Sequence, residues 1–176
     1  MNYTFTPMTD EFARQILTWK YEGEYAQYDY ENESEHILDT SEWGNTLFAV
    51  LNETETLIGE LSFGFLDGSD EWISQTSLEA GQTEGSILWV GFGLRPDLTG
   101  KGLGLSFVNA CTEYAIKVAR QRYAYRGEWV GLGVFQFNQR AIKVYERAGY
   151  VKFSELMAED CGKILPAQCI KKKIDE

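Results

Sequence analysis

The residues best placed to do chemistry in this sequence are a short run of glycines around a lysine. Residues 99–104 read TGKGLG, and a helical pattern follows directly. Glycines at alternate positions leave backbone N–H groups accessible, and the first N–H groups of a helix have no internal partner. Such a loop favours a phosphate or pyrophosphate, to which Lys101 would add a positive charge. The alternative is a glycine-rich turn without a ligand, since a single glycine pattern is a weak signal.

Two familiar phosphate-binding patterns do not fit this loop. A P-loop would need glycine at Arg95, and serine or threonine at Gly102. A dinucleotide fingerprint would need its third glycine at Leu105 or Phe107. A nucleotide-dependent oxidoreductase is therefore disfavoured, and a test for bound flavin or NAD would distinguish it.

Two segments of alternating pattern each carry a pair of glycines on one face. Gly91 and Gly93 alternate with apolar residues in the first, and Gly131 and Gly133 do so in the second. Glycine weakens a strand, so a paired occurrence indicates close approach of a ligand or of another backbone. A thin ligand arm lying along these strands would explain both pairs; bulges or tight helix packing are the alternative.

Cysteine and histidine offer no metal or disulfide framework. The three cysteines, Cys111, Cys161 and Cys169, are an odd number without CxxC spacing, and the only histidine, His36, lies in an acidic segment where we expect it at the surface. We expect no metal and a reducing, cytoplasmic location.

The charge distribution separates the first third of the chain from the rest. The net charge is −11, from 16 basic and 27 acidic residues, which argues against nucleic acid as the partner. Residues 1–60 hold 13 acids and two bases, whereas residues 61–176 hold 14 of each. An anion would therefore bind the later part and a cation the first. No run approaches the roughly 20 apolar residues of a membrane span, and the start lacks a secretory signal pattern.

The elements that must position these residues form an α/β pattern, and we expect one domain over residues 1–176. Helices are predicted after a Thr9 cap, after the glycine loop, and between an Asn138 cap and Gly149. Residues 20–42 are read as helix and loop, and residues 67–85 as a loop. The predicted strands are 3–7, 45–51, 57–66, 86–94, 129–136, 150–154 and 164–172.

Two segments together resemble the GNAT superfamily of acyl-CoA-dependent N-acyltransferases. LRPDLTGKGLG resembles the Q/R-x-x-G-x-G/A loop of that family. FNQRAIKVYERAGY resembles its N-x-x-A-x-x-x-Y-x-x-x-G-F/Y segment, and the order of elements also agrees. The resemblance implies a central mixed, mostly antiparallel sheet of about six or seven strands, splayed at the cofactor strand and flanked by about four helices.

The resemblance also implies roles for individual residues toward acetyl-CoA. Main-chain groups around Phe92 and Leu94 would pair with the pantetheine arm, Asn138 would contact it, and Tyr145 would protonate the leaving thiolate. The alternative for Tyr145 is core packing. Thr99 stands where the family usually has Gln or Arg, which predicts somewhat weaker affinity. The pyrophosphate would be held by backbone amides of Thr99, Gly100, Lys101, Gly102, Leu103 and Gly104.

An alkyl amine arrives as an ammonium ion, so a base must take a proton from it. Glu60 is the candidate, because strand alternation would place it with Ser62 and Gly64 on one face. Its alternative is a solvent-facing strand residue. Glu84 is the reserve, and the base could also act through a water.

The acceptor is predicted from the segment between Tyr21 and Glu35, which has six acids, four tyrosines and no Lys or Arg. Carboxylates concentrate cations, and tyrosine rings bind ammonium groups. We expect transfer to a primary amine of a cationic small molecule or of a peptide or protein N-terminus, by a monomer or homodimer. The alternative for this segment is a solvated acidic face. The alternative for the whole protein is a non-catalytic acyl-CoA sensor.

Overall fold

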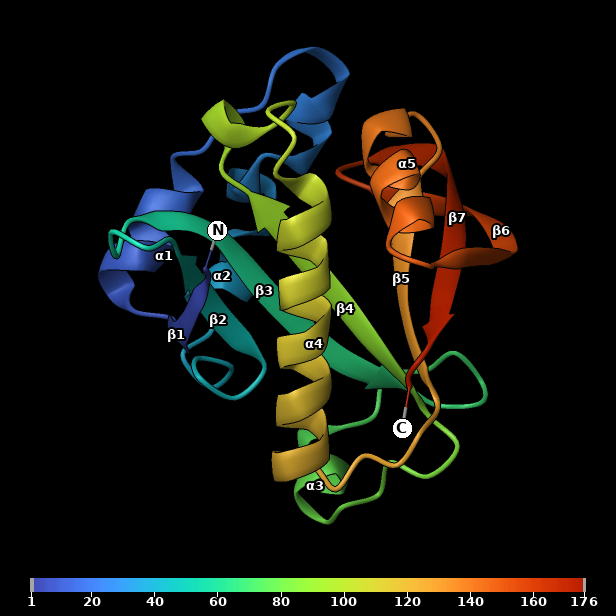
Figure 1. Cartoon of the computed structure of the whole chain (residues 1–176). Helices are drawn as coiled ribbons and strands as arrows, with labels where there is room; N and C mark the ends of the chain where they lie inside the picture. The colour runs from blue at the N-terminus through green and yellow to red at the C-terminus, as the bar shows by residue number, and fades with distance from the viewer. Residues whose placement is uncertain (1, 176) are drawn as a thin grey trace.

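The computed structural model describes residues 2–175, which form one seven-stranded mixed sheet (Figure 1). The strand order is β1-β2-β3-β4-β5-β7-β6. Neighbouring strands are antiparallel except for the parallel pair β4 and β5. The strands are β1 (Thr4–Pro7), β2 (Leu47–Leu51), β3 (Leu57–Leu66), β4 (Ile87–Leu94), β5 (Trp129–Phe135), β6 (Val151–Asp160) and β7 (Lys163–Lys173).

Helices cover both faces of this sheet. Figure 1 shows α4 and α5 in front of the sheet and α1 and α2 behind its first strands. The α-helices are α1 (Asp10–Leu17), α2 (Ser34–Leu38), α3 (Gln75–Glu79), α4 (Gly104–Arg122) and α5 (Gln139–Arg147). Short 3-10 turns add η1 (Gly23–Tyr28), η2 (Tyr30–Glu33) and η3 (Pro96–Leu98). The predicted caps are confirmed, since Thr9 accepts from the Phe12 N–H and Asn138 from the Ala141 N–H.

The sheet opens between β4 and β5. These strands pair only at Leu88 with Val130 and at Trp89 with Gly131, and no pairing continues beyond those positions among the described residues. From there to Leu94, the edge of β4 that faces β5 therefore has no strand partner. The predicted splay at the cofactor strand is confirmed.

The main core lies between α4 and the sheet. Phe107, Cys111 and Ala115 of α4 are buried against the apolar faces of β4 and β5, where Leu88 and Val130 are fully buried. Each fully buried Leu or Phe contributes roughly 1.5–3 kcal/mol of transfer free energy. This packing fixes the first turn of α4, and with it the glycine loop, at the mouth of the opening.

Two expectations from the sequence need correction. The segment 67–85 contains the short helix α3, which starts at a Ser74 side chain that accepts from the Ser77 N–H. The strand predicted to end at Ser154 continues to Asp160, because Cys161 and Gly162 both take positive φ and so form a tight hairpin turn into β7. Most side chains of β6 are exposed on both faces of the strand. Burial therefore imposes no clean alternation of polar and apolar residues on it. No helix within residues 2–175 has the length and apolar character to cross a membrane.

Candidate active site

The opening between β4 and β5 is a cavity of about 980 Å³. One end is formed by the glycine loop and by α5, and the other by residues 20–38, which we call the tyrosine segment. Glu60, Tyr145 and Asn138 all border the same cavity, although they are far apart in the sequence. The structure thus brings together most of the residues predicted from the sequence.

The glycine loop presents backbone N–H groups at the start of α4. Gly100 and Gly102 have φ of 72° and 80°. A Cβ added to Gly102 would have no atom of the protein within 4 Å apart from its two chain neighbours, so the space beside it is open. Within the described chain, the N–H groups of residues 100–103 donate to no backbone carbonyl. These groups and the helix dipole could hold an anionic pyrophosphate.

Two predicted loop residues lie differently from expectation. The Thr99 N–H and hydroxyl both donate to the Pro96 carbonyl, at 3.2 and 2.8 Å, so the Thr99 amide is already paired inside the η3 turn. Lys101 is exposed and does not border the cavity. The binding groups that remain in the loop are the amides from Gly100 onward.

Three bases of α5 border the same end of the cavity and were missed by the sequence reading: Arg140, Lys143 and Arg147. An ideal Cβ on Gly100 would lie 3.8 Å from Arg140 Nη1, which places this guanidinium beside the loop. The i, i+3, i+7 spacing of the three bases is the signal that could have found them, because it sets them on one helix face. They supply the positive charge expected from Lys101.

Phe92 and Leu94 lie on the unpaired edge of β4, as the resemblance implies. The Leu94 carbonyl already accepts a hydrogen bond from the Tyr21 hydroxyl at 2.9 Å. Asn138 is likewise engaged, since its Oδ1 caps α5 and its Nδ2 donates to the Tyr28 hydroxyl at 3.2 Å. Contacts of Leu94 or Asn138 to a cofactor would therefore share or replace these hydrogen bonds.

Tyr145 projects from α5 toward β4. Its ring is partly buried, 5.9 Å from the Phe92 ring and 6.0 Å from the Tyr150 ring. Its hydroxyl makes no hydrogen bond to another residue among those described. Burial raises the pKa of Tyr145 well above its ordinary value, so that the phenol stays protonated at neutral pH.

Glu60 is the most unusual group in the cavity. It is only 5% exposed, its Oε1 accepts from the Tyr30 hydroxyl at 2.9 Å, and its Oε2 has no hydrogen-bond partner among the described residues. Burial raises the pKa of Glu60 to about 7, although the Tyr30 hydrogen bond and the charge of His36 lower it. Its solvent-facing alternative is therefore wrong. Glu84 is exposed and does not border the cavity.

The tyrosine segment crosses the opening and contacts both halves of the sheet. It reaches β4 and β3 through Tyr21 and Tyr30. On the other side Gln27 donates to Asp160 at the end of β6, and the Arg140 guanidinium lies 4.0 Å from the centre of the Tyr25 ring. These contacts close the end of the cavity that the acidic segment borders.

His36 lies partly at the surface, as expected, since 39% of its side chain is exposed, but it also faces the cavity. It is half-buried on α2, borders the cavity, and its Nδ1 lies 2.9 Å from Glu42 Oε2. The hydrogen bond to Glu42 raises the pKa of His36. Of the six acids predicted to attract a cation, only Glu33 borders the cavity, whereas Glu31 is exposed and paired with Lys20 at 2.5 Å.

The glycine faces of β4 and β5 are filled in part by the protein itself. A Cβ on Gly93 would overlap the Tyr30 hydroxyl, and one on Gly131 would come within 2.8 Å of the Trp89 ring. Gly91 and Gly133 are exposed and border the cavity. The expectation of a ligand arm at both pairs is therefore wrong for Gly93 and Gly131, where aromatic side chains take the space.

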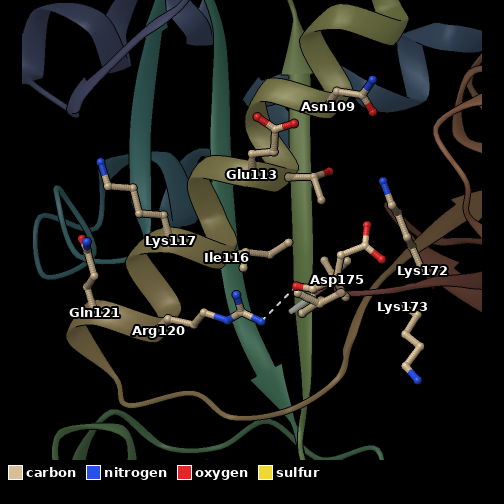
Figure 2. Close-up of a pocket in the computed structure, with 12 residues that line it drawn as sticks. Asn109, Glu113, Ile116, Lys117, Arg120, Gln121, Lys172, Lys173 and Asp175 are labelled. Atoms are coloured by element: carbon tan, nitrogen blue, oxygen red, sulfur yellow. Dashed lines mark hydrogen bonds between the residues drawn. The ribbon is translucent and has the colours of Figure 1, made fainter.

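A second, smaller hollow of about 530 Å³ lies between α4 and the end of β7 (Figure 2). Charged side chains of both signs line it, and Arg120 donates to the Asp175 carbonyl at 3.4 Å. It contains none of the predicted site residues. Among residues 2–175 no group of three or more His, Cys, Asp or Glu is placed to hold a metal ion.

Comparison with known proteins agrees with this architecture. The sequence matches the family model described as Acetyltransferase (GNAT) family over residues 11–150. No curated protein matches it significantly. A solved structure provisionally assigned as a phosphinothricin N-acetyltransferase is similar with a TM-score of 0.65 at 15% identity, covering 99% of this chain and 100% of its own.

Two solved forms of SpeG, the spermidine N-acetyltransferase of Vibrio cholerae, are also similar at 19% identity. A chimera with hSSAT has a TM-score of 0.65 and covers 98% of this chain and 96% of its own. A single-residue variant has a TM-score of 0.59, with 97% and 94% covered. These likenesses concern the fold.

The family match spans well over half of the chain, and the protein belongs to the GNAT family of acetyltransferases. Its enzyme class is N-acetyltransferase.

Proposed function

We propose that the protein transfers the acetyl group of acetyl-CoA to a primary amine of a cationic acceptor. The observation that carries this proposal is Glu60, a buried carboxyl with an unpartnered oxygen in the cavity that also holds Tyr145. A buried carboxyl with a pKa of about 7 is suited to act as a general base near neutral pH. Tyr145, which remains protonated, is suited to act as the acid.

The chain offers a site that fits acetyl-CoA. The open space at Gly102, the free N–H groups of the loop and the three α5 bases match a pyrophosphate and its neighbouring phosphate. Acetyl-CoA supplies the acetyl thioester when bound, and residues 100–104 with Arg140 would hold its phosphates. The unpaired edge of β4 at Phe92 would align the arm that carries the thioester.

The proton balance assigns a step to each of the two residues. Glu60 Oε2 takes one proton from the ammonium ion, and the freed amine nitrogen bonds to the acetyl carbon as the carbon–sulfur bond breaks. Tyr145 gives its hydroxyl proton to the departing sulfur and regains one from the acylated nitrogen. The net reaction converts an ammonium ion and a thioester into an amide, a thiol and one proton, which leaves from Glu60.

The charges of the cavity favour a cationic acceptor. Arg140, Lys143 and Arg147 lie at the loop end, whereas Glu33 and Glu60 lie among tyrosine rings at the other end. An ammonium group gains from both carboxylates and aromatic faces, whereas an anionic acceptor would be repelled there.

A thiol-release assay tests the proposal directly. Acetyl-CoA is offered with polyamines, basic antibiotics, amino acids and peptides with free N-termini, and we expect release with cationic amines. The rate should rise as pH increases toward about 7 and then level off, because Glu60 must be ionised. Binding of acetyl-CoA without release for any amine would support the acyl-CoA sensor instead.

A further inference from the structure

Glu60 is held in an asymmetric way that the proposed reaction requires. One carboxyl oxygen receives the Tyr30 hydroxyl at 2.9 Å, and the other is buried without a partner. An unpaired buried carboxyl oxygen costs free energy, so Oε2 is expected to take a partner, either a water or the ammonium group of the acceptor. The contact from Tyr30 decides which oxygen remains available.

Tyr30 is itself firmly placed by its surroundings. It is 7% exposed, and its ring packs edge-on against Trp19 at 5.9 Å. The neighbouring Asp29 anchors the start of this turn, since its Oδ1 accepts from the Tyr21 N–H at 2.8 Å and its Oδ2 lies 3.3 Å from Lys20 Nζ. The hydroxyl of Tyr30 is thus brought to Glu60 by contacts outside the cavity.

Gly93 provides the space for this arrangement. It lies opposite Glu60 in the β3–β4 register, and a Cβ there would overlap the Tyr30 hydroxyl. Gly91 lies two residues earlier on the same face of β4, and a Cβ there would meet only Ser62 Oγ, at 3.0 Å. The absent side chain at Gly93 therefore serves Tyr30, whereas Gly91 does not contact it.

We infer that Tyr30 is a positioning residue, which holds Oε1 of Glu60 by a hydrogen bond and leaves Oε2 free for the ammonium group of the acceptor. This inference rests on the proposed function of Glu60 as the base. Tyr30 moves no proton in the reaction; it fixes the direction of the carboxyl and favours its ionised form, because a donor stabilises a carboxylate. The titratable groups around Glu60 are Tyr21, Tyr30, Glu33, His36 and, from α4, Cys111.

The test is a titration of Glu60 followed by carbon NMR of the glutamate carboxyls, with the Glu60 signal identified by its loss in Glu60→Gln. Removing the donor with Tyr30→Phe should raise the midpoint by about one to two pH units, the worth of a hydrogen bond to a charged group. Tyr28→Phe is the matched control, because that hydroxyl belongs to the same segment but pairs with Asn138. Its midpoint should stay within a few tenths of a unit of the wild type.

An unchanged midpoint in folded Tyr30→Phe would overturn the inference and make Tyr30 a packing residue. Should circular dichroism show that variant to be unfolded, Gly93→Ala displaces the hydroxyl instead and should raise the midpoint, with Gly91→Ala as its control. An unchanged midpoint in Gly93→Ala would also overturn the inference. The titration is done without acetyl-CoA and without an amine. Failure of acetyl transfer in the thiol-release assay is therefore a separate result. In an active enzyme, the pH at which kcat/KM rises should increase together with the Glu60 midpoint.

Discussion

The two ends of the cavity are built in different ways. The loop end relies first on backbone N–H groups of consecutive residues at a helix start, which are local, and the bases of α5 add side-chain charge beside them. The end at the tyrosine segment relies on side chains from distant parts of the chain, such as the Tyr30 hydroxyl on Glu60, 30 residues away. A backbone site is disturbed mainly by added bulk or charge, whereas a side-chain site is disturbed by the loss of single atoms.

The largest effect is expected from added bulk and charge at the loop end. Gly102→Glu places a carboxylate where the phosphates should lie, in a residue with φ of 80°. We expect calorimetry to show no binding of coenzyme A while the circular dichroism spectrum persists. Gly81→Glu is the matched control, since Gly81 has φ of 71° and open space but lies in a remote loop. Retained binding in Gly102→Glu would remove this loop from the site.

Loss of one hydroxyl should then separate catalysis from cofactor binding. Tyr145→Phe is expected to lower kcat by roughly 10² or more with little change in affinity for acetyl-CoA, because an acid acts mainly in the transition state. Tyr150→Phe is the control, since its hydroxyl is 2.8 Å from Thr112 Oγ1 and does not border the cavity. A normal kcat in folded Tyr145→Phe would show that Tyr145 serves core packing.

The buried carboxyl at the tyrosine-segment end should also lower the stability of the folded protein. The pKa of Glu60 is raised in the folded state from 4.5 to about 7, so its contribution to stability is fully present below about pH 4.5 and is lost as pH rises through 7. Above pH 8, Glu60→Gln should therefore be more stable than the wild type by up to about 3 kcal/mol. Urea unfolding at pH 5 and pH 8.5 measures the change. The substitution Glu155→Gln, at an exposed position, should show no such pH dependence. If Glu60→Gln also lacks it, the pKa of Glu60 is not raised in the folded state.

The smallest effect tests the cationic acceptor. Glu33→Gln removes a carboxylate of the cavity, and KM for the acceptor should rise about three- to tenfold, as expected for one screened charge contact of roughly 1 kcal/mol. Glu31→Gln is the control, because Glu31 is exposed and pairs with Lys20. High salt should also raise KM, since the Debye length falls to about 3 Å at 1 M. A salt-independent KM for the best acceptor would leave the acidic segment as a solvated surface.

Much of the scaffold was predictable because its signals are local. The helices α4 and α5 follow from apolar periodicity with clear starts at the glycine loop and at Asn138, and the strands from alternation. The short helix α3 and the outer half of β6 were not predictable, because α3 buries only Leu78 within its five residues and most side chains of β6 are exposed. The place of His36 beside the cavity was not predictable, because the nearby acids Glu33 and Glu35 are exposed, whereas the fold sets α2 against the cavity.

The sequence by itself determined the glycine loop before α4, the capped start of α5 and the charge difference between residues 1–60 and the rest, since these depend on residue types and on neighbours within a few residues. Only the tertiary structure decided that Tyr30 meets Glu60, that Gly93 makes room for it and that Arg140 replaces Lys101 beside the loop. Each of these contacts joins segments far apart in the chain. Their geometry follows from where β4 and β5 separate and how residues 20–38 cross the opening, and packing of the whole domain fixes both.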